Sequence, residues 1–265
     1  MIAACSKQDE ERIFSYIGAD YPACLYLYLD LKKYGVGSEA IRVFLLQEGQ
    51  TIRAVLLQYY SCLHVFSKDD SFDAKELVDF FEEGSFTILY CASRTAQKLY
   101  EAFPGTLKAK AVVTNGYVAQ IRTVDREPRG LAVPAEDADF GQITRLIYDD
   151  EDIGRSYRYD VLAKQLAERN REGYARNLVI RRDGLVVAHA CTNAEWENIA
   201  VVAELIVREE FRKQGFASEI WRDLCRRLLS EGKEVYSFYF SEESADLHKH
   251  IGFFEVCAWT KIVVA

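Results

Sequence analysis

Apolar and polar residues follow different periods along the chain, and the clearest change of period lies between residues 200 and 229. Residues 200–207 form an apolar, largely β-branched run around Glu204, which is typical of a strand buried on both faces. Residues 217–229 carry apolar side chains at helical spacing, which predicts an amphipathic helix with one apolar stripe. The chain must therefore turn sharply from strand to helix within residues 212–217.

The periods along the rest of the chain predict one order of elements in both halves. In the first half we expect helices at 3–18, 22–34, 73–81 and 93–103, strands at 42–47, 52–60, 62–66 and 86–91, and a strand pair at 111–124 that turns at Asn115-Gly116. In the second half we expect further helices at 134–147, 157–169 and 242–251, and further strands at 177–182, 185–192, 235–240 and 259–264. The halves share this order but little residue identity, so the repetition is one of pattern.

Two domains of similar architecture follow from the repetition, at 1–128 and 132–265. We expect the junction near 126–134, where prolines and Gly130 interrupt the periodicity. The expected fold class is α/β, with a central mixed, mostly antiparallel sheet flanked by helices in each domain.

Composition and charge narrow the class of protein. Of the 265 residues, 49% are hydrophobic and 28% are charged, as in ordinary soluble globular chains. The net charge of −8 argues against a nucleic-acid partner and is compatible with a cationic substrate. The longest apolar run, 24–29, is too short to cross a membrane, and the charged segment 7–12 argues against a signal peptide. Since the seven cysteines are scattered, we expect buried thiols in a reducing cytoplasm. The shortness of the apolar runs implies no membrane partner.

The loop 212–217 has the features of an anion site. Gly215 can adopt a positive φ and leaves room for a ligand to approach the backbone. The amides at the start of the following helix have no intrahelical acceptor, and together with the helix dipole they favour an anion, most naturally a phosphate. Arg212 and Lys213 would add positive charge nearby. The alternative is a plain strand-to-helix turn that contains a glycine.

Two motifs carry a resemblance to a known family. The loop 212–217, R-x-x-G-x-A between a strand and a helix, resembles the acyl-CoA signature of the GNAT superfamily of N-acetyltransferases. Residues 241–253, S-x-x-S-x-x-L-H-x-x-x-G-F, are similar to the late helix motif of that superfamily, which usually has Asn, Ala and Tyr where this chain has Ser241, Ser244 and His248. The resemblance covers roughly residues 133–265.

The resemblance implies two tandem GNAT-like domains, of which the C-terminal one binds acetyl-CoA. The first half is then a degenerate copy or an unrelated accessory α/β domain. Its corresponding segment, 66–72, has no glycine, and Asp69 and Asp70 would repel a diphosphate. The implied CoA-binding residues of the second half are Leu205, Ile206, Val207, Arg212, Lys213, Gln214, Gly215, Phe216, Ala217, Ser218, Ser241 and Ser244.

Glu204 is the candidate base. A lone carboxylate within a buried strand must be paired, coordinate a ligand or line a cleft. In the resembled family an acidic residue near this place serves as base, directly or through water, whereas the alternative for Glu204 is a salt bridge to an arginine. Glu195 and Glu197 are weaker candidates for recognising a cationic substrate and are otherwise solvated.

His248 replaces the family's tyrosine, which protonates the departing CoA thiolate. An imidazolium, with an ordinary pKa of about 6.5, can give a proton to a thiolate whose conjugate acid has a pKa of about 8.5. Alternatively His248 is a packed residue, and Tyr236 or Tyr239 takes the acid role.

The expected function is therefore N-acetyl transfer from acetyl-CoA to the primary amine of a small molecule or peptide, in a ternary complex. The alternative is a CoA-binding sensor or scaffold without transferase activity, motivated by the departures in the late motif. Sequence patterns of other enzyme classes, among them GxxxxGK[ST], GxSxG and HExxH, are absent, so no metal is expected. The acceptor is left open, as is a homodimer.

Overall fold

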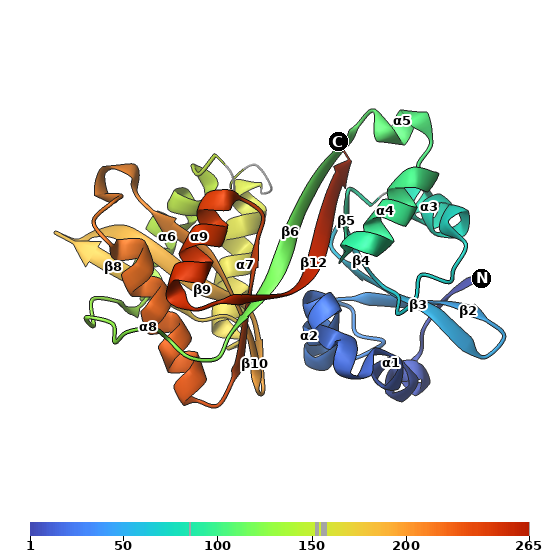
Figure 1. Cartoon of the computed structure of the whole chain (residues 1–265), viewed down its shortest axis with the longest axis horizontal. Helices are drawn as coiled ribbons and strands as arrows, with labels where there is room; N and C mark the ends of the chain where they lie inside the picture. Colours follow the sequence, from blue (N-terminus) through green and yellow to red (C-terminus); the bar gives the residue numbers. More distant parts are fainter. Residues whose placement is uncertain (85, 152–153, 155–157, 265) are drawn as a thin grey trace. The chain divides into compact units, whose positions relative to one another are not determined.

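The structure is a computed structural model that describes residues 1–84, 86–151, 154 and 158–264 (Figure 1). Its contacts divide the chain into two compact units, Met1–Val118 with Glu255–Ala265, and Ala119–Phe254. These limits differ from the expected 1–128 and 132–265, because the last strand of the chain pairs within the first unit. The expected ranges stay a prediction about which segments fold independently.

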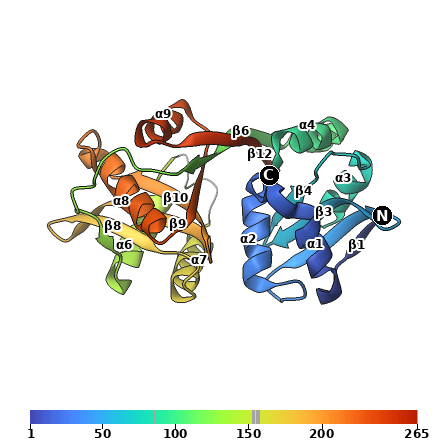
Figure 2. The ribbon, with the colours of Figure 1, turned by 60° about the horizontal axis from the view of Figure 1, so that its bottom comes forward.

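The first unit is a sheet between two pairs of helices (Figure 2). Its strands are β1 (Ile2–Ala4), β2 (Arg42–Glu48), β3 (Thr51–Tyr59), β4 (Cys62–Phe66), β5 (Ile88–Ala92) and β12 (Phe254–Val264), in the order β1-β2-β3-β4-β5-β12. Its helices are α1 (Glu10–Ile17), α2 (Leu25–Tyr34), α3 (Ala74–Glu83), α4 (Ser93–Ala102) and the short α5 (Gly105–Lys108). Successive side chains of a strand point to opposite faces of the sheet. Val55 therefore packs with α1 and α2, and Leu56 packs with α3 and α4.

The second unit repeats this arrangement. Its strands are β7 (Val133–Pro134), β8 (Asn177–Arg182), β9 (Leu185–Trp196), β10 (Ile199–Val207) and β11 (Glu234–Tyr239), in the order β11-β10-β9-β8-β7, and β6 (Ala111–Ile121) ends in this unit. Its helices are α6 (Phe140–Tyr148), α7 (Tyr159–Arg171), α8 (Phe216–Ser230) and α9 (Glu242–Ile251). Val179 packs with α6 and α7, whereas Leu178 and Ile180 pack with α8. Each unit contains a parallel strand pair, β4–β5 in the first and β10–β11 in the second. The expected mixed, mostly antiparallel α/β fold is confirmed.

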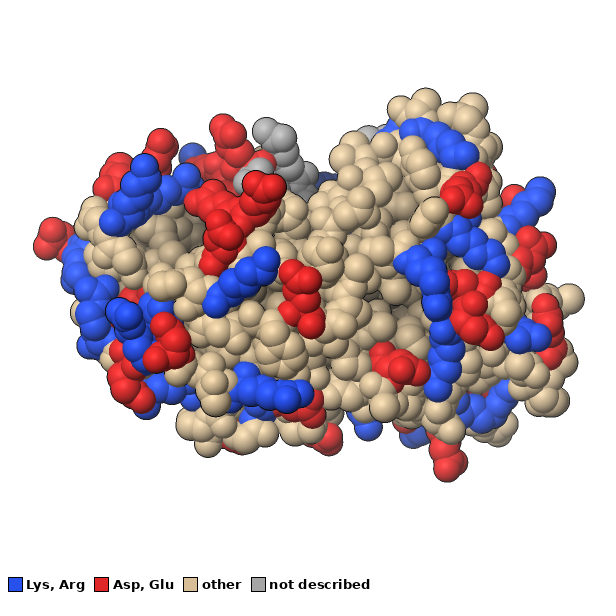
Figure 3. All heavy atoms as spheres, in the orientation of Figure 1, with Lys and Arg blue, Asp and Glu red and all other residues tan. Residues whose placement is uncertain are grey.

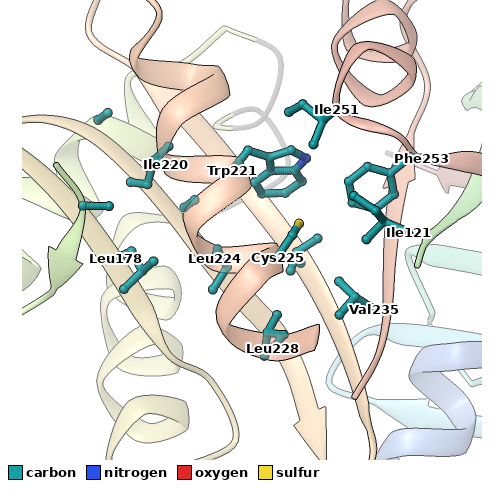
Figure 4. Close-up of a cluster of buried hydrophobic side chains, with 14 of the residues drawn as sticks. Ile121, Leu178, Ile220, Trp221, Leu224, Cys225, Leu228, Val235, Ile251 and Phe253 are labelled. Carbon is teal, nitrogen blue, oxygen red and sulfur yellow. The ribbon is translucent and has the colours of Figure 1, made fainter. Parts of the chain in front are cut away.

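The apolar stripe of α8 anchors the helix on the sheet. Ile220, Trp221, Leu224, Cys225 and Leu228 are all buried, and the ring of Trp221 points from α8 toward Phe253 and Ile251 (Figure 4). Burying an apolar side chain of this size contributes about 1.5–3 kcal/mol. The stripe expected from the sequence therefore fixes where the N-terminus of α8 lies.

Some expected elements are wrong. Residues 111–121 form the single continuous strand β6, so Asn115-Gly116 is no hairpin turn, and Asn115 Oδ1 instead accepts a hydrogen bond from Thr260 Oγ1 at 2.7 Å. The expected helix starts at residues 3 and 134 are also wrong, because Ile2–Ala4 pairs with β2 and Val133–Pro134 with β8. Tyr157, the expected start of another helix, lies outside the described residues.

Candidate functional site

The β10–β11 pair ends before either strand does. The parallel ladder joins Ile199–Val202 to Glu234–Ser237 and, among the described residues, goes no further. Just beyond it, Glu204 has a φ of 52°, and the register between β10 and β9 shifts between Ala203 and Ile206. A positive φ costs a residue with a Cβ about 1–2 kcal/mol, so this bend is maintained against strain. The edge of β10 after residue 202 is thus not paired with β11.

The loop that follows β10 leads into α8 through two residues in the left-handed region. Lys213 has a φ of 60° and Gly215, the N-cap of α8, a φ of 83°. A Cβ built on Gly215 would meet nothing closer than 3.9 Å, so its conformation requires the glycine and the surrounding space is open. The amides of Phe216, Ala217 and Ser218 in the first turn have no intrahelical acceptor. This geometry suits an anion, as expected from the sequence.

Most side chains of the loop are engaged elsewhere. Arg212 donates from Nε to the Val207 carbonyl oxygen at 3.2 Å, and its guanidinium lies 3.8 Å from Asp150. Gln214 donates to the Glu210 carbonyl oxygen at 3.4 Å, and the Phe216 ring is buried in the core. The loop therefore offers a ligand mainly its backbone.

Glu204 lies inside the fold and is 9% exposed. Its Oε2 accepts a hydrogen bond from Cys191 Sγ at 3.4 Å, and its carbonyl oxygen lies 3.2 Å from His189 Nδ1. Burial first, and the Glu204 carboxylate second, raise the pKa of the Cys191 thiol well above its usual value, so Cys191 stays protonated and donates. Burial lowers the pKa of His189 to about 4, which keeps the ring neutral at pH 7. The base role of Glu204 stays a prediction.

His248 is 4% exposed and bound at both ring nitrogens. Its Nδ1 lies 2.6 Å from the Ser244 carbonyl oxygen, and its Nε2 lies 2.8 Å from Ser237 Oγ. Because a carbonyl oxygen only accepts, Nδ1 carries the proton and the Ser237 hydroxyl donates to Nε2. Burial lowers the pKa of His248, so the imidazolium expected from the sequence is disfavoured. The acid role of His248 stays a prediction, and the ring of Tyr239 lies against its ring at 5.0 Å between centroids, with the planes tilted by 41°.

Other expected residues have structural partners. Glu195 is buried and accepts from Arg176 Nε at 2.9 Å, so it is not solvated, whereas Glu197 is exposed. Tyr236 donates to Glu234 at 2.8 Å. Ser241 caps α9 by accepting from the Ser244 amide at 3.2 Å.

Two side chains that the sequence did not single out lie at these features. Ser237 is the last β11 residue of the ladder and binds His248. Arg129, in the expected junction, places Nη2 3.9 Å from the Cβ position of Gly215. No spacing along the chain indicates either contact, since the partners lie 11 and 86 residues away (248 − 237 and 215 − 129).

The described residues were searched for metal-binding groups and for membrane-spanning helices. They hold no group of three or more His, Cys, Asp or Glu arranged to bind a metal. Among the same residues, no helix combines the length and apolarity needed to traverse a bilayer. Acidic and basic side chains are interspersed on the face shown in Figure 3.

Comparisons with known proteins agree with the fold. Residues 142–255 match the family model described as the acetyltransferase (GNAT) family. A Drosophila protein has a similar structure, with a TM-score of 0.70 and 10% identity over 100% of this chain and 98% of that chain. A GCN5-related N-acetyltransferase from Sphaerobacter thermophilus has a TM-score of 0.66 and 15% identity over 99% and 94%. A tandem GNAT protein from the clavulanic acid biosynthesis pathway has a TM-score of 0.60 and 10% identity over 100% and 98%.

Identities this low show the fold alone, and a search of curated protein sequences finds no match. The match of residues 142–255 includes the split strand pair, the loop and α8. The chain therefore carries an acetyltransferase (GNAT) family domain at residues 142–255 and has, over its full length, the two-domain fold of a tandem GNAT protein.

Proposed function

We propose that the second unit transfers an acetyl group from acetyl-CoA to a primary amine in a ternary complex. The observation that carries the proposal is the ladder that ends at Val202 and Ser237 on the same strand that leads into the Gly215 loop. An unpaired strand edge can hydrogen-bond the amide-containing pantetheine arm, while the loop amides bind the diphosphate. The positive φ of Gly215 and the open space around it fit such a ligand.

The direction of the β10 amides supports one candidate for the oxyanion donor. The Arg208 amide donates to the Val187 carbonyl oxygen, toward β9, and the Val207 carbonyl oxygen accepts from Arg212. Because backbone groups alternate along a strand, the Val207 amide points away from β9 and the Ile206 amide toward it. Of the Ile206 and Val207 amides, that of Val207 is therefore our proposed donor to the tetrahedral oxyanion.

Proton transfer completes the proposed reaction. Glu204, or a water that it holds, takes a proton from the alkylammonium, whose pKa is near 10. The amine nitrogen then attacks the thioester carbon, and the nitrogen of the tetrahedral intermediate gives its second proton to solvent as the C–S bond breaks. The departing thiolate takes a proton from Tyr239, which solvent protonates again, or from a His248 that has first bound a proton at Nε2. The Glu204 carboxylate is restored when its proton passes to solvent.

A CoA-binding protein without transferase activity is the second candidate. It is favoured by the neutral His248, whose two nitrogens are already hydrogen-bonded to Ser244 and Ser237. Such a domain would bind acetyl-CoA through the same loop and release no thiol.

Thiol release over a panel of polyamines, amino acids, aminoglycosides and peptides, combined with acetyl-CoA binding, separates the two. We expect amine-dependent release, and a decrease of about 100-fold in turnover for Glu204→Gln at unchanged acetyl-CoA affinity. The matched control is Glu197→Gln, an exposed carboxylate near the same strand. Binding without release on any amine would favour the sensor, and no binding would refute both.

A further inference from the structure

The segment that the sequence marks as a domain junction is bound along α8. We call residues 122–132 the strap. Arg222 of α8 holds Asp125 at 2.6 and 3.0 Å, and Arg227 donates to the Ala132 carbonyl oxygen at 3.1 Å. The side chain of Arg222 is 7% exposed and that of Asp125 is 31% exposed, so the arginine holds the strap from within the fold. The strap therefore has a fixed course beside the helix.

A buried carboxylate connects the strap to the first turn of α8. The side chain of Glu219 is 6% exposed, and it accepts from Arg129 Nε at 3.2 Å and from the Leu131 amide at 3.4 Å. A carboxylate out of water is costly unless it is paired and hydrogen-bonded. Because Glu219 needs both partners, it holds the Arg129 guanidinium at the N-terminus of α8.

The rest of that guanidinium remains available to a ligand. A guanidinium has five N–H donors, and only Nε of Arg129 donates to an acceptor among the described residues. The Arg129 side chain is 59% exposed, and its Nη2 lies 3.9 Å from the Cβ position of Gly215. A planar pair of Nη groups suits bidentate contact with phosphate oxygens.

We propose that Arg129, held by Glu219, binds the diphosphate of CoA from the strap. The inference rests on the proposed function and adds a residue that neither motif contains. The cations of the loop itself are less suited: Arg212 already donates to Val207 and faces Asp150, and Lys213 is exposed on a strained backbone. Arg129 also offsets the charge of Glu219, which would otherwise repel an anion at this helix start.

Isothermal titration of the full chain with CoA and with dephospho-CoA, which keeps the diphosphate but lacks the 3′-phosphate, tests the proposal. Arg129→Ala should weaken binding of both ligands by the same factor, about tenfold, as for loss of a charge-assisted hydrogen bond at a half-exposed site. Arg126→Ala is the matched control, because Arg126 is an exposed strap residue that faces Asp125 at 4.0 Å. It should change either affinity less than about twofold.

Arg129→Ala also leaves the buried Glu219 carboxylate without its cation, and the Glu219→Gln variant separates this effect from the loss of binding. In Glu219→Gln the buried charge is gone, so Arg129→Ala added to it tests the guanidinium alone. The loss should again be about tenfold relative to Glu219→Gln, with the melting temperatures of both variants confirming that they fold. Equal affinities of these two variants, or a loss confined to CoA, would overturn the proposal. A wild-type protein that binds neither ligand would instead refute the proposed function.

Discussion

The two units contain the same strand-to-helix junction in different chemical states. In the first unit, β4 ends at Phe66 and α3 begins at Ala74, and Asp70 between them is buried with a φ of 53°. Asp70 Oδ1 accepts from Thr95 Oγ1 at 2.6 Å, and its other oxygen is paired with Arg94. In the second unit the corresponding loop holds Gly215 and no buried carboxylate of its own.

The N-terminus of α3 is capped by a side chain, whereas that of α8 is not. Asp73 caps α3 by accepting from the Lys75 amide at 2.9 Å, whereas Gly215 provides no side-chain cap to α8. Lys98 also donates to the Asp70 and Phe72 carbonyl oxygens at 2.5 and 2.6 Å. The first junction is thus satisfied by its own acidic and basic side chains, while the second leaves amides free for a ligand. Asp70 has a structural role, rather than being a surface charge that repels one.

The largest expected effect is on the strand-to-helix junction of the second unit, whose loop amides are free for a ligand. Gly215→Val places a β-branched side chain in the left-handed region and over the loop amides, so affinity for acetyl-CoA should fall at least about a thousandfold. Titration calorimetry measures it. Gly184→Val, at a φ of 78° in the β8–β9 turn with nothing within 4 Å, carries the same strain away from the loop and should retain binding. Equal losses in the two variants would mean that strain, not the site, is responsible.

Acid should weaken both units through a buried histidine in each. Burial lowers the pKa of His64 in β4 and of His189 in β9 to about 4, below the value of about 6.5 in the unfolded chain. The unfolded chain therefore binds more protons, and the free energy of unfolding falls as the pH falls from 6.5 to 4. Each histidine contributes a loss of about 3 kcal/mol by pH 4.

Urea unfolding between pH 7 and 4 measures this loss. His64→Phe keeps an aromatic ring against Tyr90, which lies 5.0 Å away between centroids, and should reduce the pH dependence of the first unit alone. An unchanged dependence would show that His64 is not the titrating group.

The strand-to-helix junction of the first unit should matter for the stability of that unit and not for acetyl-CoA binding. Asp70→Ala leaves the buried Thr95 hydroxyl without its acceptor and should lower the free energy of unfolding of the first unit by about 2 kcal/mol. Asp69→Ala removes an exposed neighbour and should cost about 0.5 kcal/mol or less. Affinity for acetyl-CoA should be unchanged in both. A change in that affinity would contradict the assignment of CoA binding to the second junction.

The smallest expected effect concerns the late helices. The seventh residue of α4 is the buried Leu99 and that of α9 is His248, so His248→Leu introduces the residue of the first unit. Turnover should fall about tenfold and acetyl-CoA affinity less than about twofold, if the His248–Ser237 pair assists the leaving thiolate. Equal turnover in His248→Leu and wild type would assign the proton to Tyr239 or to solvent.

Local pattern was enough to predict most elements. The stripe of α8 and the helix 242–251 could be predicted because their apolar side chains recur with the period of a helix. The strand β10 could be predicted because a short, β-branched apolar run suits a strand buried on both faces. Asn115-Gly116 shows the limit, since a strong turn signal lies within the continuous strand β6, where Asn115 is held by Thr260. The pairing that overrides the local preference comes from residues 145 positions away.

For the site, the sequence by itself determined the glycine, the amides of the loop and the presence of Glu204 and His248, because these depend on local backbone conformation and residue type. Only the tertiary structure decided that His248 is neutral, that Ser237 is bound to it and that Arg129 reaches Gly215. Protonation and charge placement depend on burial and on partners far along the chain, and no local pattern contains that information.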